Sequence, residues 1–499
     1  MLAAQFGAGR KVNRGTMKVL LVQPPTLRSF GLQTFMLPEP LGLELVAASL
    51  MPEHEVRLLD MRLEPGLANA LDSFQPDTVG VSTCFTSDVY NVYRILQIVK
   101  KQNPRIFTFV GGQHATMAHA DFFGKVDAVV LGEGESTAPE LLRRWEQNKP
   151  LNQVSGIVFR RGDSWIPSQP RNLIDNLDET PLPARSLISK YLPHYFIGAR
   201  QPCSSVETSR GCPYRCKFCS VWRFFSHSFR SRNPQRVVQE LKQIESPHVF
   251  FTDDNALANP SRSDTLISEI KKAGVRKRYL MQVRADSVAK HRDLLAKWRD
   301  IGLEAVFIGF ESIRQQKLNE FAKGLSVNAI EEAIETLRSL NITVMSSFII
   351  SPDFDKMDFA ALRQFVRHMK LPMPTFSILT PLPGTVLYEE KAQEITDHNY
   401  ELYDLLHSTL PTRLGLKEFY RQFIRLYVSS YLPYFTPSGL FQTFTTRNPV
   451  NFFNVTSKAV RMLAANNYRA LTKHHQLPPG KLSEVNFPKQ AWRLERGKV

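Results

Sequence analysis

The sequence predicts an α/β protein with two successive domains, each built around a parallel β-sheet, followed by a mostly helical region. Three observations lead to this prediction. The chain has 499 residues, which is too long for one ordinary hydrophobic core. Short apolar runs alternate with helix-like stretches over the first 150 residues, and they do so again from 201 to about 385. Continuous apolar runs are typical of buried parallel strands, and helices between them provide the crossovers.

The first alternation predicts a doubly wound, Rossmann-like domain over 17–150. Its strand candidates are KVLLVQ (18–23), EVRLLD (55–60), TVGVST (78–83), IFTFVGG (106–112) and DAVVLGEGE (127–135), and its helix candidates are 41–51, 88–102 and 136–147. Residues 1–16 are basic and rich in Gly and Ala but lack the apolar core of a signal peptide. We therefore expect a disordered tail and a cytoplasmic protein. No run of 18 apolar residues predicts a membrane span.

Residues 151–200 interrupt this rhythm. GIVFRRGDSWIPSQP predicts a small hairpin with a Gly-Asp turn, and the Pro-rich, acidic DNLDETPLPARSL is typical of a linker.

The second alternation predicts a partial (β/α)6 barrel of the TIM type over 201–390. Its strand candidates are 204–209, 248–254, 278–284, 305–311, 343–350 and 375–381, and its helix candidates are 234–245, 262–273, 289–301, 326–340 and 357–369.

A cluster of three cysteines follows the first strand of this barrel. The stretch ETSRGCPYRCKFCSVW spaces them as Cys212-x3-Cys216-x2-Cys219, which are three of only five cysteines. In a reducing cytosol such a cluster indicates metal binding or catalysis more than disulfides. A cubane cluster has four irons, so three thiolates leave one iron open for chemistry. The alternative is a zinc site completed by a distant histidine or by Cys203.

Polar residues also end the next three barrel strands. Asp253, Asp254 and Asn255 follow the second, Arg284 the third, and Glu311 the fourth. Such barrels place their active sites at the carboxyl ends of the strands. There the arginine suits a carboxylate, and the acidic residues suit ribose hydroxyls and an ammonium group. Alternatively, each residue caps the following helix or pairs with a neighbour.

The cysteine spacing, with Phe218 just before the last cysteine, resembles the radical S-adenosylmethionine (SAM) superfamily. The stretches GLEAVFIGFES, KGLSVNAIEEAIETLRSLNI and TPLPGTVLYEE are similar to late-barrel signatures of that superfamily. The resemblance implies that Cys212, Cys216 and Cys219 hold a 4Fe–4S cluster as metal ligands and catalytic residues, and that SAM completes the open iron. It also implies a 5′-deoxyadenosyl radical and an electron donor of the flavodoxin or ferredoxin type. This chain has TDDN where many relatives have Gly-Gly-Glu, and SSFIISPDF lacks the glycines often found at the fifth strand.

Glycines end two strands of the first domain. Gly111 and Gly112 end one, and Gly132, Glu133 and Gly134 end the other. Glycine lets a bulky ligand approach the backbone, although either group alone also suits a plain turn. The motifs VQPPT, GVSTC (with Ser82 and Thr83), VGGQHAT and VVLGEGES resemble the cobalamin-binding domain of B12-dependent radical SAM enzymes.

The Asp-x-His-x-x-Gly motif, whose histidine ligates cobalt in many B12 enzymes, is absent. QPPTLRSFG follows the first strand, and His114 and His119 come later. We expect cobalamin to bind without a protein histidine on cobalt.

The C-terminal region 391–499 is aromatic and basic. Residues 411–499 carry 14 Lys and Arg against 3 Asp and Glu, a net +11 of the chain's +16. Aromatic residues recur among the basic ones, including Tyr420, Phe423, Tyr427, Tyr431, Tyr434, Phe435, Phe441 and Phe444. They predict either a helical cap that packs on the barrel or a peripheral patch at an anionic inner membrane surface. Nucleic acid is not expected, because no RNA-binding signature accompanies the basic residues.

These resemblances imply a cobalamin-dependent radical SAM methyltransferase. One SAM methylates cobalamin, another supplies the radical, and the methyl group passes from methylcobalamin to an unactivated carbon. The chain as a whole, with its aromatic and basic C-terminal region and the stretch YDLLHSTLPTRL, is similar to lipid-modifying members such as the hopanoid C-3 methylases, which implies a lipid or other hydrophobic substrate. The alternatives are a radical SAM cyclase that forms a ring, and a cobalamin- or SAM-binding regulator without turnover.

Overall fold

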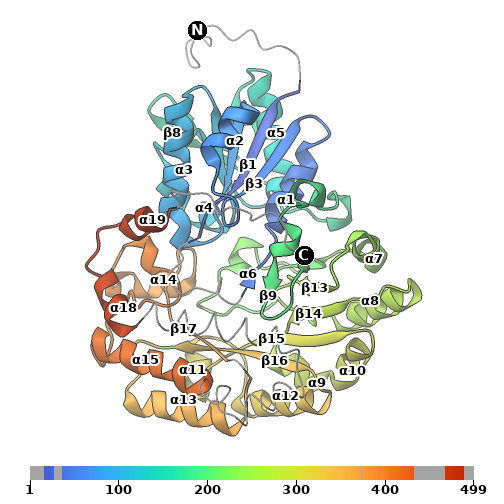
Figure 1. Ribbon diagram of the computed structural model, residues 1–499, viewed down its shortest axis with the longest axis vertical. Helices are drawn as coiled ribbons and strands as arrows, with labels where there is room; N and C mark the ends of the chain where they lie inside the picture. The colour runs from blue at the N-terminus through green and yellow to red at the C-terminus, as the bar shows by residue number, and fades with distance from the viewer. Residues whose placement is uncertain (1–15, 27–35, 373, 432–466, 488–499) are drawn as a thin grey trace, which may run out of the picture. The chain divides into compact units, whose positions relative to one another are not determined.

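The computed structural model describes residues 16–26, 36–372, 374–431 and 467–487 (Figure 1). Contacts divide the chain into two compact units. The first comprises 1–27, 40–191 and 479–499, and the second comprises 28–39 and 192–478. This division differs from the expected domain boundaries. Residues 36–39 belong with the second unit, whereas most of the expected linker and residues 479–487 belong with the first.

A seven-stranded sheet forms the first unit, in the order β3-β1-β4-β5-β6-β7-β8. Its parallel strands are β3 (Glu55–Asp60), β1 (Lys18–Gln23), β4 (Thr78–Ser82), β5 (Phe107–Gly111) and β6 (Ala128–Val130). Antiparallel β7 (Ile157–Arg161) and β8 (Ser164–Pro167) extend its edge. They form the predicted hairpin, with Gly162 at a φ of 62° in the turn.

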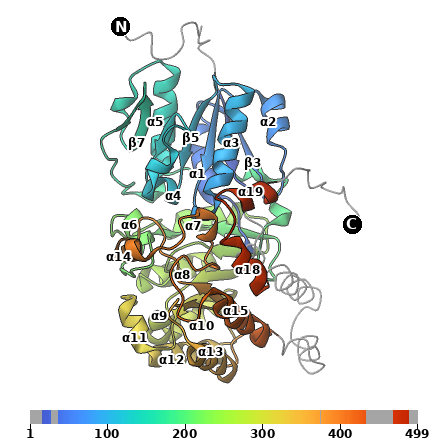
Figure 2. The same ribbon diagram turned by 90° about the vertical axis from the view of Figure 1, so that its left-hand side faces the viewer.

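Helices cover both faces of this sheet (Figure 2). Val19 and Leu21 of β1 belong to one hydrophobic core, whereas Leu20 and Val22 belong to the other, because successive strand residues point to opposite faces. On the first face lie α1 (Leu41–Leu50) and α5 (Gly134–Glu146). On the second lie α2 (Leu67–Phe74), α3 (Val89–Gln102) and α4 (Gln113–Met117). The predicted doubly wound domain is confirmed.

The second unit is built on a six-stranded parallel sheet in the order β10-β13-β14-β15-β16-β17. The strands are β10 (Cys203–Val206), β13 (His248–Phe251), β14 (Arg278–Gln282), β15 (Leu303–Glu311), β16 (Thr343–Ile350) and β17 (Thr375–Ile378). Because β10 and β17 are both edges, the sheet is the predicted partial barrel.

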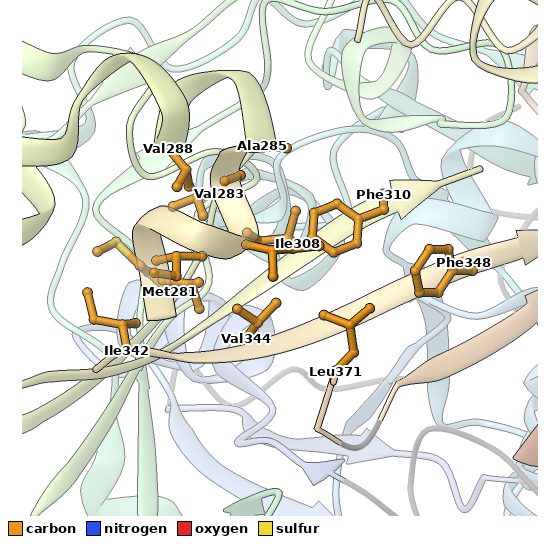
Figure 3. Packing of buried hydrophobic residues seen from close by; sticks show 14 of the residues in the cluster. Met281, Val283, Ala285, Val288, Ile308, Phe310, Ile342, Val344, Phe348 and Leu371 are labelled. Carbon is orange, nitrogen blue, oxygen red and sulfur yellow. The ribbon is translucent and has the colours of Figure 1, made fainter. Parts of the chain in front are cut away.

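Helices pack on the outer face of the barrel sheet. They are α7 (Pro234–Gln243), α8 (Pro260–Lys272), α9 (Ala285–Lys290), α10 (Arg292–Asp300), α11 (Gln315–Glu320), α12 (Val327–Ser339), α13 (Lys356–His368) and α15 (Leu416–Tyr431). Figure 3 shows part of this core, with Met281, Ile308, Val344 and Phe348 among the buried side chains. Phe307, Met345 and Ser347, on the intervening strand positions, are only half-buried. The outer face therefore supplies the packed core, and the inner face remains partly accessible.

Some elements escaped prediction because they are short. Helices α2, α4 and α11 have eight residues or fewer. Strands β2 (Met36–Leu37) and β9 (Phe196–Ile197) pair antiparallel across a long stretch of chain. Met36 and Ile197 pack with Cys203, Leu280 and Ala305 in a small cluster. This pairing explains why residues just before 40 belong to the second unit.

Four aromatic residues of the C-terminal region cap the barrel. Tyr420, Phe423, Tyr427 and Tyr431 of α15 are buried in the barrel core. Tyr427 donates a hydrogen bond from its hydroxyl to the carbonyl of Phe376 at 2.6 Å. The capping alternative is thus confirmed for these four residues. Tyr434, Phe435, Phe441 and Phe444 lie outside the described residues, as does nearly all of the expected tail 1–16.

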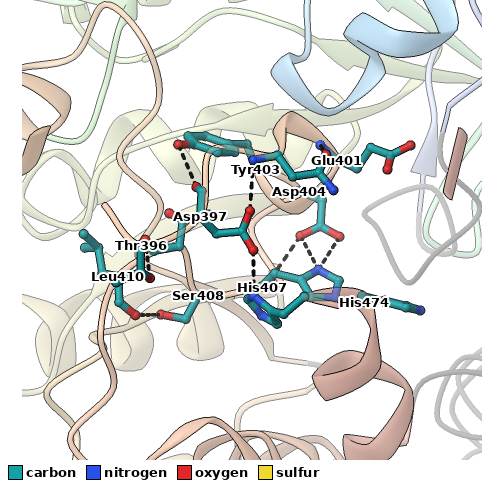
Figure 4. A network of polar contacts seen from close by, with 12 residues as sticks. Thr396, Asp397, Glu401, Tyr403, Asp404, His407, Ser408, Leu410 and His474 are labelled. Atoms are coloured by element: carbon teal, nitrogen blue, oxygen red, sulfur yellow. Dashed lines mark hydrogen bonds and ion pairs between the residues drawn. The ribbon is translucent and has the colours of Figure 1, made fainter. Parts of the chain in front are cut away.

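A polar network lies beside α15 and α18 (Tyr468–His474) (Figure 4). The Nδ1 atom of His407 lies 3.0 Å from both carboxylate oxygens of Asp404, and its Nε2 lies 3.0 Å from Nδ1 of His474. Burial, aided by the charge of His407, lowers the pKa of His474 to about 4. A neutral His474 therefore accompanies the buried His407–Asp404 pair at neutral pH.

Among the described helices, none is both long enough and apolar enough to cross a bilayer.

Candidate active site

The three clustered cysteines lie in one loop at the carboxyl end of β10. This loop runs from β11 (Ser209–Arg210) to the short helix α6 (Val221–Phe224). Cys216 is buried, whereas Cys212 and Cys219 are half-buried. The position is the one that the β/α alternation predicted for them.

The three thiols influence each other's ionisation. Burial raises the pKa of each of them, and that of Cys219 reaches about 12. The charges of Cys216 and Cys212 contribute to the rise at Cys219. At Cys216 the positive charges of Lys323 and Arg284 oppose the rise. Iron binding must displace protons from these thiols, and the two nearby cations favour the thiolate form.

The cysteine loop supplies three thiols as candidate metal ligands. In the part of the chain that the structure describes, no three His, Cys, Asp or Glu side chains are arranged to hold one ion. The zinc alternative needs four ligands that meet at one point. A cubane cluster instead offers a separate iron to each thiolate, so its three ligands need not converge. The donor set therefore fits an iron–sulfur cluster better than zinc.

Contacts from several barrel elements hold the cysteine loop in place. Trp222 donates its indole N–H to the carbonyl of Cys216 at 3.0 Å. Backbone hydrogen bonds join Lys217 to Phe321 at 3.0 Å and to Leu387 of α14 (Val386–Lys391) at 2.9 Å. The Phe218 ring meets the Phe321 ring edge-on, with centroids 5.6 Å apart. Phe218, a predicted cofactor-binding residue, is thus a packing anchor of the loop.

Arg284 follows β14 and lies beside the cysteine loop. Its guanidinium carbon lies 3.4 Å from the ring centroid of Tyr214, between the first two cysteines. Its Nε donates to Asp286 at 3.0 Å, and its Nη2 donates to the carbonyl of Lys323 at 2.8 Å. Although burial lowers the pKa of Arg284, Asp286 outweighs it, and the group stays charged. Sequence reasoning missed Tyr214 and Asp286, which carry no motif of their own.

Glu311, at the end of β15, forms a buried ion pair with Lys323. The Lys323 ammonium donates to Glu311 Oε1 at 2.7 Å, and both side chains are at most 10% exposed. Burial lowers the pKa of Lys323, but the charges of Glu311 and Cys216 raise it overall. Sequence reasoning missed this lysine, although it begins the recognised stretch KGLSVNAIEEA.

Gly309 makes room for the Glu311 carboxylate. A Cβ atom added at Gly309 would lie 2.3 Å from Glu311 Oε1, and Glu311 itself has a φ of 65°. The carboxylate therefore folds back over the glycine, which gives the stretch GFE a geometric reason.

The residues that follow β13 have different roles. Asp253 is fully buried and accepts hydrogen bonds from the Thr208 and Ser209 hydroxyls and from the Thr208 amide. It braces the start of the cysteine loop, and its role as a cofactor contact stays a prediction. Asp254 accepts from the Gly211 amide at 3.2 Å, and burial raises its pKa to about 7. The side-chain amide of Asn255 is buried, and neither its nitrogen nor its oxygen has a hydrogen-bond partner among the described residues.

In the first unit, the predicted residues at the ends of β4 and β5 support one loop. Thr83 donates its amide to Gly111 at 2.8 Å and accepts from the His114 amide at 3.0 Å. A Cβ atom added at Gly112, whose φ is 110°, would lie 3.0 Å from the Thr83 carbonyl. Gly112 therefore permits close approach of the β4 loop, and its contact with a ligand stays a prediction. Ser82 is buried, and its hydroxyl contacts the Cys84 thiol at 3.4 Å.

The residues Gly132, Glu133 and Gly134, which follow β6, also differ in their surroundings. A Cβ atom added at Gly132, with a φ of 69°, would meet nothing within 4 Å. Of the four glycines predicted to border cobalamin, Gly132 is therefore the one that adjoins open space. At Gly134 it would lie 3.0 Å from Val46 of α1, which makes Gly134 a helix-packing residue. The Glu133 carboxylate accepts from the Ile174 amide at 2.7 Å and so fastens the expected linker.

Neither candidate histidine is placed as an obvious metal ligand. His114 is buried, with Nδ1 3.0 Å from the Thr86 hydroxyl and Nε2 3.1 Å from Asp121. Both of its ring nitrogens are therefore engaged inside the unit. His119 is half-buried against Phe123.

Two family models match the chain in the order that the motifs suggested. The B12 binding domain matches residues 35–142, and the Radical SAM superfamily matches 206–366. The second match contains the cysteine loop, Arg284, Glu311 and Lys323. Together the two matches support the cofactors cobalamin, SAM and a 4Fe–4S cluster.

The chain is similar to two methyltransferases over most of its length. It is 37% identical to the hopanoid C-3 methylase of Methylococcus capsulatus over 82% of this chain and 79% of that one. It is 30% identical to an uncharacterised methyltransferase of Pyrococcus horikoshii over 75% of this chain and 83% of that one.

The structure is also similar to a solved cobalamin-dependent radical SAM enzyme. The cobalamin-dependent SAM radical enzyme OxsB, solved with aqua-cobalamin and SAM bound, superposes with a TM-score of 0.66 at 17% identity, over 95% of this chain and 78% of that one. The chain therefore belongs to the cobalamin-dependent radical SAM family of methyltransferases.

Proposed function

We propose that this enzyme methylates an unactivated carbon of a lipid, and that a hopanoid is the substrate. The observation that carries the proposal is the 37% identity to a hopanoid C-3 methylase over four fifths of the chain. The half-buried Phe307 and Met345 on the inner face of the barrel sheet suit an apolar substrate.

We assign the site residues as follows. Cys212, Cys216 and Cys219 hold the cluster, and Lys323 and Arg284 supply positive charge beside Cys216. Asp254, after β13, and Glu311, at the end of β15, face the polar groups of SAM. Gly132 borders the cobalamin in the first unit. When bound, the cluster and SAM supply a 5′-deoxyadenosyl radical, and cobalamin supplies the methyl group.

A test of the reaction uses the reconstituted enzyme, kept anaerobic with SAM, cobalamin, a hopanoid and a flavodoxin-type reductant. We expect a product heavier by one methyl group, with one S-adenosylhomocysteine and one 5′-deoxyadenosine formed per methyl transferred. Ring formation would release 5′-deoxyadenosine without S-adenosylhomocysteine, and a regulator would release neither.

The lipids of a deletion strain test the substrate class independently. We expect the strain to lack one methylated lipid and to accumulate the same lipid without that methyl group. Unchanged lipids together with a missing soluble metabolite would exclude the lipid substrate while leaving the methyl transfer intact.

We also propose that α15 lies near an anionic membrane surface, from which such a substrate is drawn. Lys417, Arg421 and Arg425 recur on its exposed face, followed by Val428, which is 39% exposed. Each cation near anionic lipid contributes about 1 kcal/mol to binding.

Replacing all three cations by glutamine should therefore weaken binding to phosphatidylserine vesicles about 100-fold, measured by co-sedimentation at low salt. The matched control replaces Lys271, Lys272 and Arg276, near the end of α8, and removes the same charge. Equal losses in both triple variants would contradict a role for α15 in particular.

A further inference from the structure

The sheet of the first unit has a topological switch point between β1 and β4. In the order β3-β1-β4-β5, the chain moves from β1 to one side and later returns to the other. Ligands of doubly wound sheets bind outside the carboxyl ends of the strands at such a point. The loop that follows β4, residues 83–88, therefore flanks the expected cobalamin site.

This loop is held rigidly. The Thr83 amide and carbonyl bond to the backbone of Gly111 and His114, at 2.8 and 3.0 Å. At the other end, the Thr86 hydroxyl lies 3.0 Å from Nδ1 of His114, and both Thr83 and Thr86 are buried. Anchors on both sides leave little freedom for the two residues between them, Cys84 and Phe85.

The Phe85 side chain of this loop is solvent-exposed. The residue is 56% exposed. Among the described residues, five large hydrophobic side chains are exposed, and Phe85 is the aromatic one. The Phe85 carbonyl accepts from the Asp88 amide at 3.2 Å, which fixes the backbone at the ring. A rigidly presented, unpacked aromatic ring at a ligand-binding edge suits a flat apolar surface.

The polar groups nearby leave few other candidates for this position. Both ring nitrogens of His114 are engaged by Thr86 and Asp121. Cys84 is exposed, and its thiol contacts the Ser82 hydroxyl at 3.4 Å.

We infer that Phe85 lies against the corrin face turned toward this sheet and closes that axial position of cobalt to water and to protein ligands. The inference rests on cobalamin binding and is independent of the substrate. Where many other B12 enzymes place a histidine on cobalt, this chain places an aromatic ring that leaves the axial position without a ligand.

The experiment examines cob(II)alamin bound to the full-length protein by electron paramagnetic resonance. Phe85→His should place an imidazole at the axial position and add nitrogen superhyperfine splitting that the wild type lacks. Phe85→Ala should admit water, shift the spectrum toward a water-bound form and weaken cobalamin binding about tenfold. The control is Met51→His, which adds a histidine at another exposed position, 44% exposed beyond the end of α1.

Three results would overturn the inference. Bound cobalamin with wild-type spectra and affinity in both Phe85 variants would show that Phe85 does not face cobalt. A sulfur-ligated spectrum that Cys84→Ser abolishes would assign the position to Cys84. Failure of the wild type to bind cobalamin would overturn the cofactor assignment itself, and with it the role of Phe85.

Discussion

Replacing any one of Cys212, Cys216 and Cys219 by alanine is expected to abolish both the iron–sulfur cluster and the cleavage of SAM. Each thiol lies in the single loop after β10. Three thiolates hold three of the four irons and leave one open for a substrate, so the loss of any thiolate leaves a second iron without a protein ligand. Anaerobically reconstituted variants should retain little iron and sulfide, lack the broad charge-transfer absorption of the cluster, and release no 5′-deoxyadenosine.

The remaining two cysteines provide matched controls. Cys203 is buried at the start of β10, where burial and the charge of Glu39 raise its pKa to about 12, so it stays a neutral thiol. Cys84 is exposed in the first unit. Cys203→Ala and Cys84→Ala should retain the cluster. Loss of iron from Cys203→Ala alone would instead indicate a closed site with four cysteine ligands.

Replacing Lys323 by methionine is expected to destabilise the barrel unit by about 3–5 kcal/mol, because it leaves the Glu311 carboxylate buried without its counter-charge. Chemical unfolding followed by circular dichroism measures the loss. The double variant Lys323→Met with Glu311→Gln should recover much of it, since no buried charge remains.

An exposed ion pair in the same unit supplies the control for this measurement. Lys391 and Glu394 lie 2.8 Å apart, with side chains 37% and 54% exposed. Lys391→Met should change the free energy of unfolding by no more than about 1 kcal/mol. If the Lys323 single variant and the double variant were equally unstable, the loss would come from packing around the lysine stem and not from the unpaired carboxylate.

The cysteine and Lys323 predictions concern the same site. Cys216 lies close enough to Lys323 for the ammonium to lower the pKa of the thiol, and Lys323 is in turn held by Glu311. Loss of Lys323 should therefore weaken retention of the cluster as well as the fold. The cysteine variants need not destabilise the barrel to the same degree, since they remove thiols and leave no buried charge unpaired.

The sequence by itself determined the two parallel sheets and the place of the cysteine loop. Both follow from local patterns: apolar runs of strand length, helices between them, and a three-cysteine spacing directly after a strand. The strand ends also predicted Arg284 and Glu311 correctly as neighbours of that loop, because the carboxyl ends of parallel strands share one edge. Such signals need only a few consecutive residues.

Only the tertiary structure decided what several of the polar and glycine residues contact within the protein. Asp253 braces Thr208 and Ser209, Glu133 fastens Ile174, and Gly112 admits the β4 loop. The partners are distant in the chain or belong to neighbouring loops, so no local pattern distinguishes a brace from a ligand contact. The same reason hid Lys323, whose pairing with Glu311 depends on the way that the loop after α11 returns to the barrel mouth. Strand β2, only two residues long, was hidden likewise, because its pairing with β9 comes from the fold and not from its own sequence.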